Sequence, residues 1–137
     1  MTKLIAENSY KSDISLLPEI QDFVLSNVSE FLSDKEQKER LALAIAEAAS
    51  NGIIHGNKSN PSLPIKIKVE LEKNYLVIKI YDEGKGFNPE KVPDPTTDEN
   101  ILKENGRGIF IIKNLVDLIS YNFTEKGTET TLKISIK

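Results

Sequence analysis

Apolar and polar residues alternate with a period of two along three stretches of this chain. In residues 65–72 every second side chain is apolar, and those between are lysine or glutamate. Apolar residues recur at every second position again in residues 76–80 and 132–136. Lys73-Asn74 forms the predicted tight turn between the first two stretches. Strands with one apolar and one polar face are typical of an antiparallel sheet that is covered on one side only.

Two earlier segments repeat their apolar residues at helical spacing instead. Residues 18–32 predict an amphipathic helix of about four turns, with Pro18 in its first turn. Ser33 and Asp34 are suitable N-cap residues for a second helix, which we expect to cover about residues 35–56.

The remaining segments supply further strands, a helix and a long loop, which together indicate the fold class. Residues 3–10 show a weak strand pattern, a third helix is expected to begin at Gly106, and residues 120–124 form another strand. Residues 88–105 contain three of the six prolines and no sustained periodicity, and so long a loop in a compact domain is usually a functional lid or disordered. Because helices must cover the apolar face of the sheet, we predict an α+β fold. It is a two-layer α/β sandwich whose mostly antiparallel sheet is covered by helices on one face.

The composition narrows the class of protein. A chain of 137 residues, of which 39% are hydrophobic, has the size of a single compact domain, here residues 1–137. The lack of cysteine excludes disulfides, thiolate-zinc sites and cysteine nucleophiles, and a single histidine excludes multi-histidine metal sites. The net charge of -3 disfavours a dedicated nucleic-acid surface. The N-terminus lacks the apolar core of a secretory signal and no stretch is long enough to span a membrane, so we expect a cytoplasmic protein.

Candidate chemistry begins in the second helix. Glu47 and Asn51 are four positions apart inside the otherwise small and apolar run of residues 46–56, and His55 follows at the same interval. In a helix these side chains project from one face. A helix suited to burial seldom places a carboxylate and an amide there without a partner. We interpret that partner as a magnesium-bound nucleotide.

Two further groups fall on the same layer. Asp82 has the parity of the apolar residues in its strand and so points to the helix-covered side, where a carboxylate needs a polar partner. Gly84 and Gly86 follow at once and break the strand. Gly106-Arg107-Gly108 opens the third predicted helix.

Each group has a chemistry that suits a nucleotide. The Asn51 carbonyl could supply one oxygen to magnesium, which usually keeps several waters, and Glu47 could orient a water or accept a proton from an attacking hydroxyl. Asp82 could accept a hydrogen bond from the amine of adenine, while the two glycines after it let the backbone pass close to the base. Gly106-Arg107-Gly108 would place backbone N–H groups at the phosphates, and Arg107 would add a charged fork.

Taken singly, each group has a simpler explanation. An isolated Glu-x3-Asn pair is more often a solvent-facing part of a helix, Asp82-Glu83-Gly84 a strand-ending turn, and Gly106-Arg107-Gly108 a flexible loop. His55 near a helix C-terminus is more often a dipole-compensating or packing residue, and Thr128 and Thr130 are ordinary strand residues. The ordered set, at matching ends of its elements, favours the nucleotide.

The same residues resemble the motifs of a known family. Glu47-x3-Asn51-x3-His55-Gly56 is similar to an N-box, Asp82-x-Gly84-x-Gly86-Phe87 to a G1 box, and Gly106-Arg107-Gly108-Ile109 to a G2 box. Gly127-Thr128 stands where a weaker G3 element is expected. This is the pattern of the GHKL ATP-binding (Bergerat) fold, shared by gyrase, MutL and histidine kinases. The short chain and the histidine after the N-box are most similar to the anti-sigma factor serine kinases of bacterial stress and sporulation control.

The resemblance implies bound ATP and Mg²⁺, with Asn51 as the magnesium ligand and Asp82 as the adenine contact. Glu47 would be the general base for transfer to a protein serine, and residues 88–105 would be the ATP lid. Arg107 would lie near the terminal phosphate. Further nucleotide contacts would come from Gly84, Gly86, Gly106, Gly108, Thr128 and Thr130.

The expected function is that of an ATP-dependent protein serine kinase that also sequesters a sigma factor. Its acceptor would be a small anti-anti-sigma (STAS-type) protein, and the family suggests a homodimer. The alternative is a nucleotide-binding regulatory module that controls a partner by association without phosphoryl transfer. A detached histidine kinase domain is disfavoured, because the only histidine is His55 and no dimerisation hairpin precedes the domain. In the last alternative the motifs are coincidental.

Overall fold

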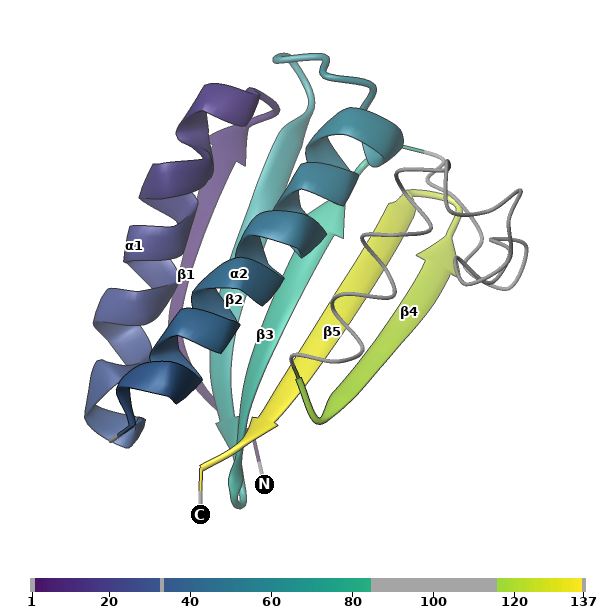
Figure 1. Cartoon of the computed structure of the whole chain (residues 1–137). Coiled ribbons are helices and arrows are strands. Elements are labelled where there is room, and N and C mark those ends of the chain that lie inside the picture. Colours follow the sequence, from purple (N-terminus) through teal and green to yellow (C-terminus); the bar gives the residue numbers. More distant parts are fainter. Residues whose placement is uncertain (1, 33, 85–115, 137) are drawn as a thin grey trace, which may run out of the picture.

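The computed structural model describes residues 2–32, 34–84 and 116–136. Within these residues the strands form one sheet in the order β1-β2-β3-β5-β4, and all neighbouring strands are antiparallel (Figure 1). This confirms the predicted antiparallel sheet. The strands are β1 (Thr2–Lys11), β2 (Pro64–Glu72), β3 (Tyr75–Asp82), β4 (Leu118–Thr124) and β5 (Gly127–Ser135).

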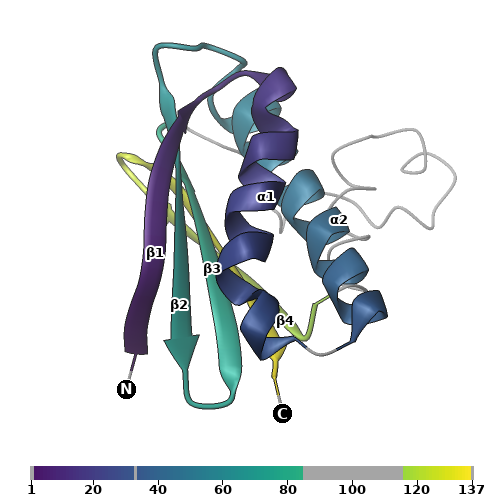
Figure 2. The same ribbon diagram turned by 90° about the vertical axis from the view of Figure 1, so that its left-hand side faces the viewer.

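Two helices cover one face of this sheet, α1 (Leu17–Val28) and α2 (Lys35–Asn51). Figure 2 shows the two layers from the side, with both helices on the same face. On the opposite face lysine and glutamate pair across the strands, as in the ion pair of 3.3 Å between Lys79 Nζ and Glu70 Oε1. The predicted α+β sandwich is therefore confirmed for the described segments.

A hydrophobic core fills the space between the two layers. The helices contribute residues at helical spacing and the strands contribute every second residue, as the periodicity predicts. The largest fully buried side chains are Ile20, Leu32, Leu41, Ile45, Ile53, Ile65, Ile67, Leu76, Ile78, Ile80 and Leu132.

The helix ends refine the predicted boundaries. The backbone N–H of Glu36 donates to Asp34 Oδ1 over 3.0 Å, so Asp34 is the N-cap of α2, whereas Ser33 lies outside the described residues. The first helix ends sooner than predicted, because Ser29–Phe31 is a 3-10 turn. The α-helix α2 ends at Asn51, and the chain then forms one π-helical turn as far as Gly56.

Strand β1 is longer than the weak pattern in residues 3–10 suggests. Its register with β2 shifts between Leu4 and Ala6, so Ile5 is the extra residue of a β-bulge. A bulge reverses the alternation of faces along a strand, and this explains why the period of two is hard to see there.

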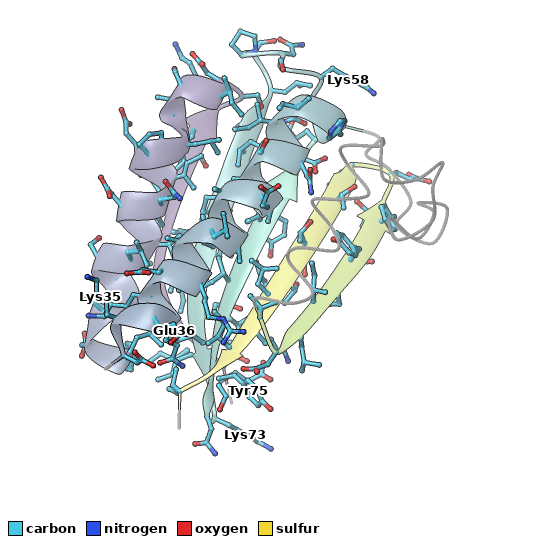
Figure 3. The ribbon with its side chains drawn as sticks, viewed as in Figure 1. Lys35, Glu36, Lys58, Lys73 and Tyr75 are labelled. Carbon is cyan, nitrogen blue, oxygen red and sulfur yellow. The ribbon has the colours of Figure 1, made fainter. Side chains whose placement is uncertain are left out.

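Figure 3 distinguishes the two ends of the molecule. Lys35 and Glu36, at the start of α2, lie toward the same end of the molecule as Lys73 and Tyr75 at the β2–β3 turn, whereas Lys58, just after the π-helical turn, lies at the opposite end (Figure 3). No helix in the described segments is both long and apolar enough to cross a bilayer. The predicted lid and the start of the predicted third helix lie outside these segments, and β4 begins at Leu118, two residues before the strand predicted at 120–124.

Candidate functional site

Asp82 is the last residue of β3, and its side chain lies on the helix-covered side, as its strand parity predicts. Only 7% of the residue is exposed. A Cβ placed on Gly56 would lie 2.5 Å from Asp82 Cγ, and one placed on Gly52 would lie 3.7 Å from Asp82 Oδ2. The carboxyl group therefore packs directly against the π-helical turn that follows α2.

This environment changes the protonation of Asp82. Burial raises the pKa of Asp82 from its ordinary value of 3.8 to about 6, and backbone hydrogen bonds from Gly84 and Thr128 oppose that rise. The Gly84 N–H donates to Asp82 Oδ1 over 3.2 Å. No neighbouring charge is among the causes of this pKa shift. A buried carboxylate without a cation is costly unless further donors bind it.

Two threonines of β5 face the same layer. Thr128 is the cross-strand partner of Asp82, and Thr130 is that of Ile80 one step deeper. Both threonines are buried, and Thr128 Oγ1 has no hydrogen-bond partner among the described residues. Buried hydroxyl groups are nearly always hydrogen-bonded, so this orphan beside an acidic group suits a polar ligand or a water.

A cavity of about 260 Å³ opens at the strand ends; Asp82 and Thr128 line it together with Tyr81 and Glu129 of the opposite face, and no residue of α2 or of the π-helical turn does. It lies where β3 ends and β4 turns into β5, and its volume is close to the lower end of the range for small-molecule sites, roughly 300 Å³. The residues that line it are Tyr81, Asp82, Glu83, Thr124, Lys126, Gly127, Thr128 and Glu129.

Two glycines are required by the backbone around Asp82. A Cβ on Gly84 would overlap the carbonyl oxygen of Gly56, and one on Gly127 would overlap the carbonyl oxygen of Asp82. Gly127 also has φ of +143°, which L side chains rarely adopt. The close approach predicted for Gly84 is thus present, but toward the π-helical turn; a contact with a base stays a prediction.

Asn51 and Glu47 lie on the helix that leads into this turn. Asn51 is the last residue of α2 and is 8% exposed, whereas Glu47, one turn earlier, is only partly buried. Since Gly52 follows Asn51 directly and packs on Asp82, the structure brings the first two predicted groups to one end of the fold. His55 belongs to the π-helical turn itself and is partly exposed.

Several predicted site residues fall in the part of the chain that the structure does not describe. They are the residues of the predicted ATP lid, 88–105, and Gly86, Gly106, Arg107 and Gly108.

The polar side chains of this site suit a nucleotide better than a metal ion that is held by protein ligands alone. In the described segments no three residues among histidine, cysteine, aspartate and glutamate lie close enough together to hold a metal ion. Magnesium is commonly bound by one or two protein oxygens together with phosphates and waters, a role for which a single Asn51 oxygen is enough. Among the described residues the Thr128 hydroxyl has no hydrogen-bond partner, and together with the buried Asp82 carboxyl it suits a ligand with both a donor and an acceptor.

The sequence patterns missed one polar residue of this site. Asn57 belongs to the loop predicted after Gly56, yet it is 1% exposed and its Oδ1 accepts a hydrogen bond of 2.8 Å from the Glu83 N–H, next to Asp82. Its Nδ2 donates to Ser12 Oγ over 2.8 Å. Asparagine in a loop predicts a turn rather than a buried connection between distant strands, so local spacing holds no signal for this residue.

The chain is similar in sequence to a family of ATPase domains and to several bacterial regulatory proteins. A family model described as a histidine kinase-like ATPase domain matches residues 10–134. An anti-sigma F factor of Bacillus cytotoxicus is 30% identical over 116 residues, which cover 80% of this chain and 80% of that relative. A serine-protein kinase RsbW of Oceanobacillus iheyensis is 32% identical over 93 residues, which cover 64% of this chain and 59% of that relative.

A solved structure shares the fold at much lower identity. The RsbU and RsbW domains of a Mycobacterium tuberculosis protein match with a TM-score of 0.66 and 15% identity. The match covers 95% of this chain and 32% of that one. A likeness at this identity is one of fold, and it agrees with the two-layer arrangement of helices on an antiparallel sheet.

Proposed function

This chain belongs to the histidine kinase-like ATPase domain family, and we propose that it is an ATP-binding anti-sigma regulatory factor that phosphorylates a serine of an anti-anti-sigma, STAS-type partner. The observation that carries the nucleotide site is the buried Asp82 carboxyl beside the buried Thr128 hydroxyl, which has no hydrogen-bond partner among the described residues. The proposed partners rest on the relatives named anti-sigma F factor and serine-protein kinase.

Adenine is the ligand that suits this pair. Its exocyclic amine is a donor for the Asp82 carboxylate, and an adjacent ring nitrogen can accept from Thr128 Oγ1 directly or through a water. Because Thr128 is the cross-strand partner of Asp82, its position favours a contact at the base rather than at a phosphate. Thr130, one step deeper in the same strand, stays a proposed nucleotide contact.

The phosphates would extend from the base toward the end of α2. We assign Asn51 as the protein ligand to Mg²⁺, which when bound neutralises phosphate charge. Gly84 and Gly86 would approach the nucleotide through their backbone. Gly106, Arg107 and Gly108 would hold the phosphates with N–H groups and a guanidinium.

Glu47 is the proposed general base. As the acceptor serine oxygen forms its bond to the γ-phosphorus, the bond between that phosphorus and the β,γ-bridging oxygen breaks, ADP leaves, and the serine proton passes to the Glu47 carboxylate. Glu47 lies one turn before Asn51 on α2, and its partial exposure gives an external hydroxyl a route to it.

The surface around Glu47 supports a protein as the acceptor. Leu43 is 47% exposed and Ile54 is 40% exposed, and both lie within one or two helical turns of Glu47. Leu43 lies four residues before Glu47 and shares its stripe of α2, whereas Ile54 lies beyond the end of α2, in the π-helical turn. Exposed apolar groups on either side of a base suit an acceptor serine that is carried by a folded protein.

Incubation with Mg-ATP and a STAS-type protein from the same organism tests the assignment. We expect phosphoserine on the partner, and we expect Glu47→Ala to reduce its rate at least a hundredfold while ATP affinity stays within about twofold. Glu47→Gln, which keeps the shape, should be equally inactive. Transfer at the wild-type rate in both variants would refute Glu47 as the base.

Sequestration without transfer is the second candidate. The relative from Bacillus cytotoxicus is named as an anti-sigma factor, a name that describes binding. A stable complex with a sigma factor, together with an unphosphorylated STAS-type partner after long incubation with Mg-ATP, would favour this function.

A further inference from the structure

Asn57 connects three parts of the chain that are remote in sequence. Its Nδ2 donates to Ser12 Oγ over 2.8 Å, before α1, and to the carbonyl oxygen of Pro64 over 3.0 Å, at the start of β2. Its Oδ1 accepts from the Glu83 N–H over 2.8 Å, just after β3. With both amide hydrogens and the carbonyl oxygen used, the side chain is held in one orientation.

The backbone of Asn57 also closes the π-helical turn. Its N–H donates to the carbonyl oxygen of Gly52 over 2.8 Å. One residue therefore binds both walls around the Asp82 carboxyl, namely the turn that carries Gly56 and the strand end that continues into Glu83.

Asp82 depends on the relative position of those two walls. A Cβ on Gly56 would lie 2.5 Å from Asp82 Cγ, so the carboxyl fits against the turn with no spare space. Without the bond from Asn57 Oδ1 to the Glu83 N–H, the chain that follows Asp82 loses the hydrogen bond that ties it to the residue after the turn. The carboxyl would then lose the direction in which it accepts a hydrogen bond.

We propose that Asn57 is a positioning residue that orients the Asp82 carboxyl and thereby determines how strongly the site recognises the 6-amino group of adenine. Asn57 itself has no part in ligand contact; it acts through the strand end. This rests on the proposed ATP site, and it goes beyond it by assigning base recognition to a residue outside the nucleotide motifs.

Ser12 provides a matched control within the same network. Ser12 is 1% exposed, and its Oγ donates to the carbonyl oxygen of Leu63 over 2.6 Å while it accepts from Asn57 Nδ2. Ser12→Ala removes buried hydrogen bonds of comparable worth, yet it leaves the bond between Asn57 Oδ1 and the Glu83 N–H in place. A purely structural role predicts the same behaviour for variants of Ser12 and Asn57.

The test is a double-variant cycle between the protein and its ligand. Calorimetry gives Kd for ATP and for purine riboside triphosphate, which lacks only the 6-amino group, with wild type, Ser12→Ala and Asn57→Ala. We expect wild type and Ser12→Ala to prefer ATP by a similar factor, and Asn57→Ala to lose about tenfold of that preference, the equivalent of one hydrogen bond. Asn57→Ser, whose side chain is too short to reach Glu83, should lose it as well, and serves if Asn57→Ala does not fold.

The outcomes separate the two proposals. An unchanged preference in both Asn57 variants, or an equal loss in Ser12→Ala, would overturn the positioning role and leave the ATP site standing. Failure of the wild type to bind either nucleotide would overturn the proposed function itself.

Discussion

The Cα of Gly56 lies so close to the Asp82 carboxyl that a side chain at position 56 would occupy the same space. A Cβ there would lie between 2.5 and 2.7 Å from all three carboxyl atoms of Asp82. Gly56, which ends the N-box pattern, therefore leaves room for the carboxyl group of Asp82, which begins the G1 pattern, because glycine has no side chain.

Gly56→Ala should therefore impair nucleotide binding without touching the nucleotide. We expect ATP affinity to fall at least tenfold and the free energy of unfolding to fall by about 1–3 kcal/mol, because the carboxyl has to move out of a packed position. Calorimetry and urea denaturation measure the two effects. Gly52→Ala is the control, since a Cβ there would meet the end of the Ile65 side chain at 3.1 Å and Asp82 only at 3.7 Å. An equal loss of ATP binding in both variants would contradict this.

Asp82 makes stability depend on pH. Its native pKa of about 6 exceeds the ordinary 3.8, so between pH 4 and pH 6 the native state binds more protons than the unfolded state. The free energy of unfolding consequently falls as pH rises through this window, by about 3 kcal/mol for a shift of about two units. Asp82→Asn should remove this fall, so that the variant is more stable than wild type at pH 7 and binds ATP more weakly. Urea denaturation from pH 4 to pH 7.5 gives both curves, and parallel curves would refute the assignment.

Thr128→Val should make the protein more stable and weaken its binding of ATP. The substitution keeps the size of the side chain but removes a buried hydroxyl that has no partner among the described residues. We expect the free energy of unfolding without ligand to rise by about 1 kcal/mol and ATP affinity to fall several-fold. Thr131→Val on the opposite face of β5 is the control, and it should leave ATP affinity unchanged. A loss of stability in Thr128→Val would indicate that its hydroxyl is already hydrogen-bonded.

Asn51→Ala should abolish the effect of magnesium. If Asn51 is the protein ligand to Mg²⁺, the variant should bind ATP equally with Mg²⁺ and with a chelator, and both affinities should be close to that of wild type in the chelator. Titration of ATP under the two conditions measures this. Ser50→Ala, one position earlier on α2, should keep the full magnesium dependence. Magnesium dependence that survives in Asn51→Ala would assign the metal to other ligands.

Periodicity predicts those features of this fold that depend on neighbours in the sequence. The alternation in β2, β3 and β5, the cap at Asp34 and the inward side of Asp82 all follow from local spacing, and the structure confirms them. Local spacing fails where the backbone adds a residue, as in the bulge at Ile5 and in the π-helical turn.

Contacts between residues far apart in the sequence are the second kind of feature that local spacing cannot predict. Asn57 bonds to Ser12 and Glu83, which are 45 and 26 residues away, and no spacing rule connects such positions. The same holds for Asp82 and Thr128, whose pairing depends on which strand lies next to β3. The site is assembled by strand order, and strand order is a property of the whole sheet.

Strand β5 is the last strand along the described chain, yet it lies inside the sheet, between β3 and β4 (Figure 1). During synthesis on the ribosome, Asp82 therefore faces an unpaired strand edge until β5 emerges, and Thr128 reaches it only then. A nascent chain that has not yet released β5 holds both described helices but not the strand pairing that places Thr128 beside Asp82. If Asp82 and Thr128 form the proposed adenine contact, ATP would stabilise only chains in which β5 has already paired with β3.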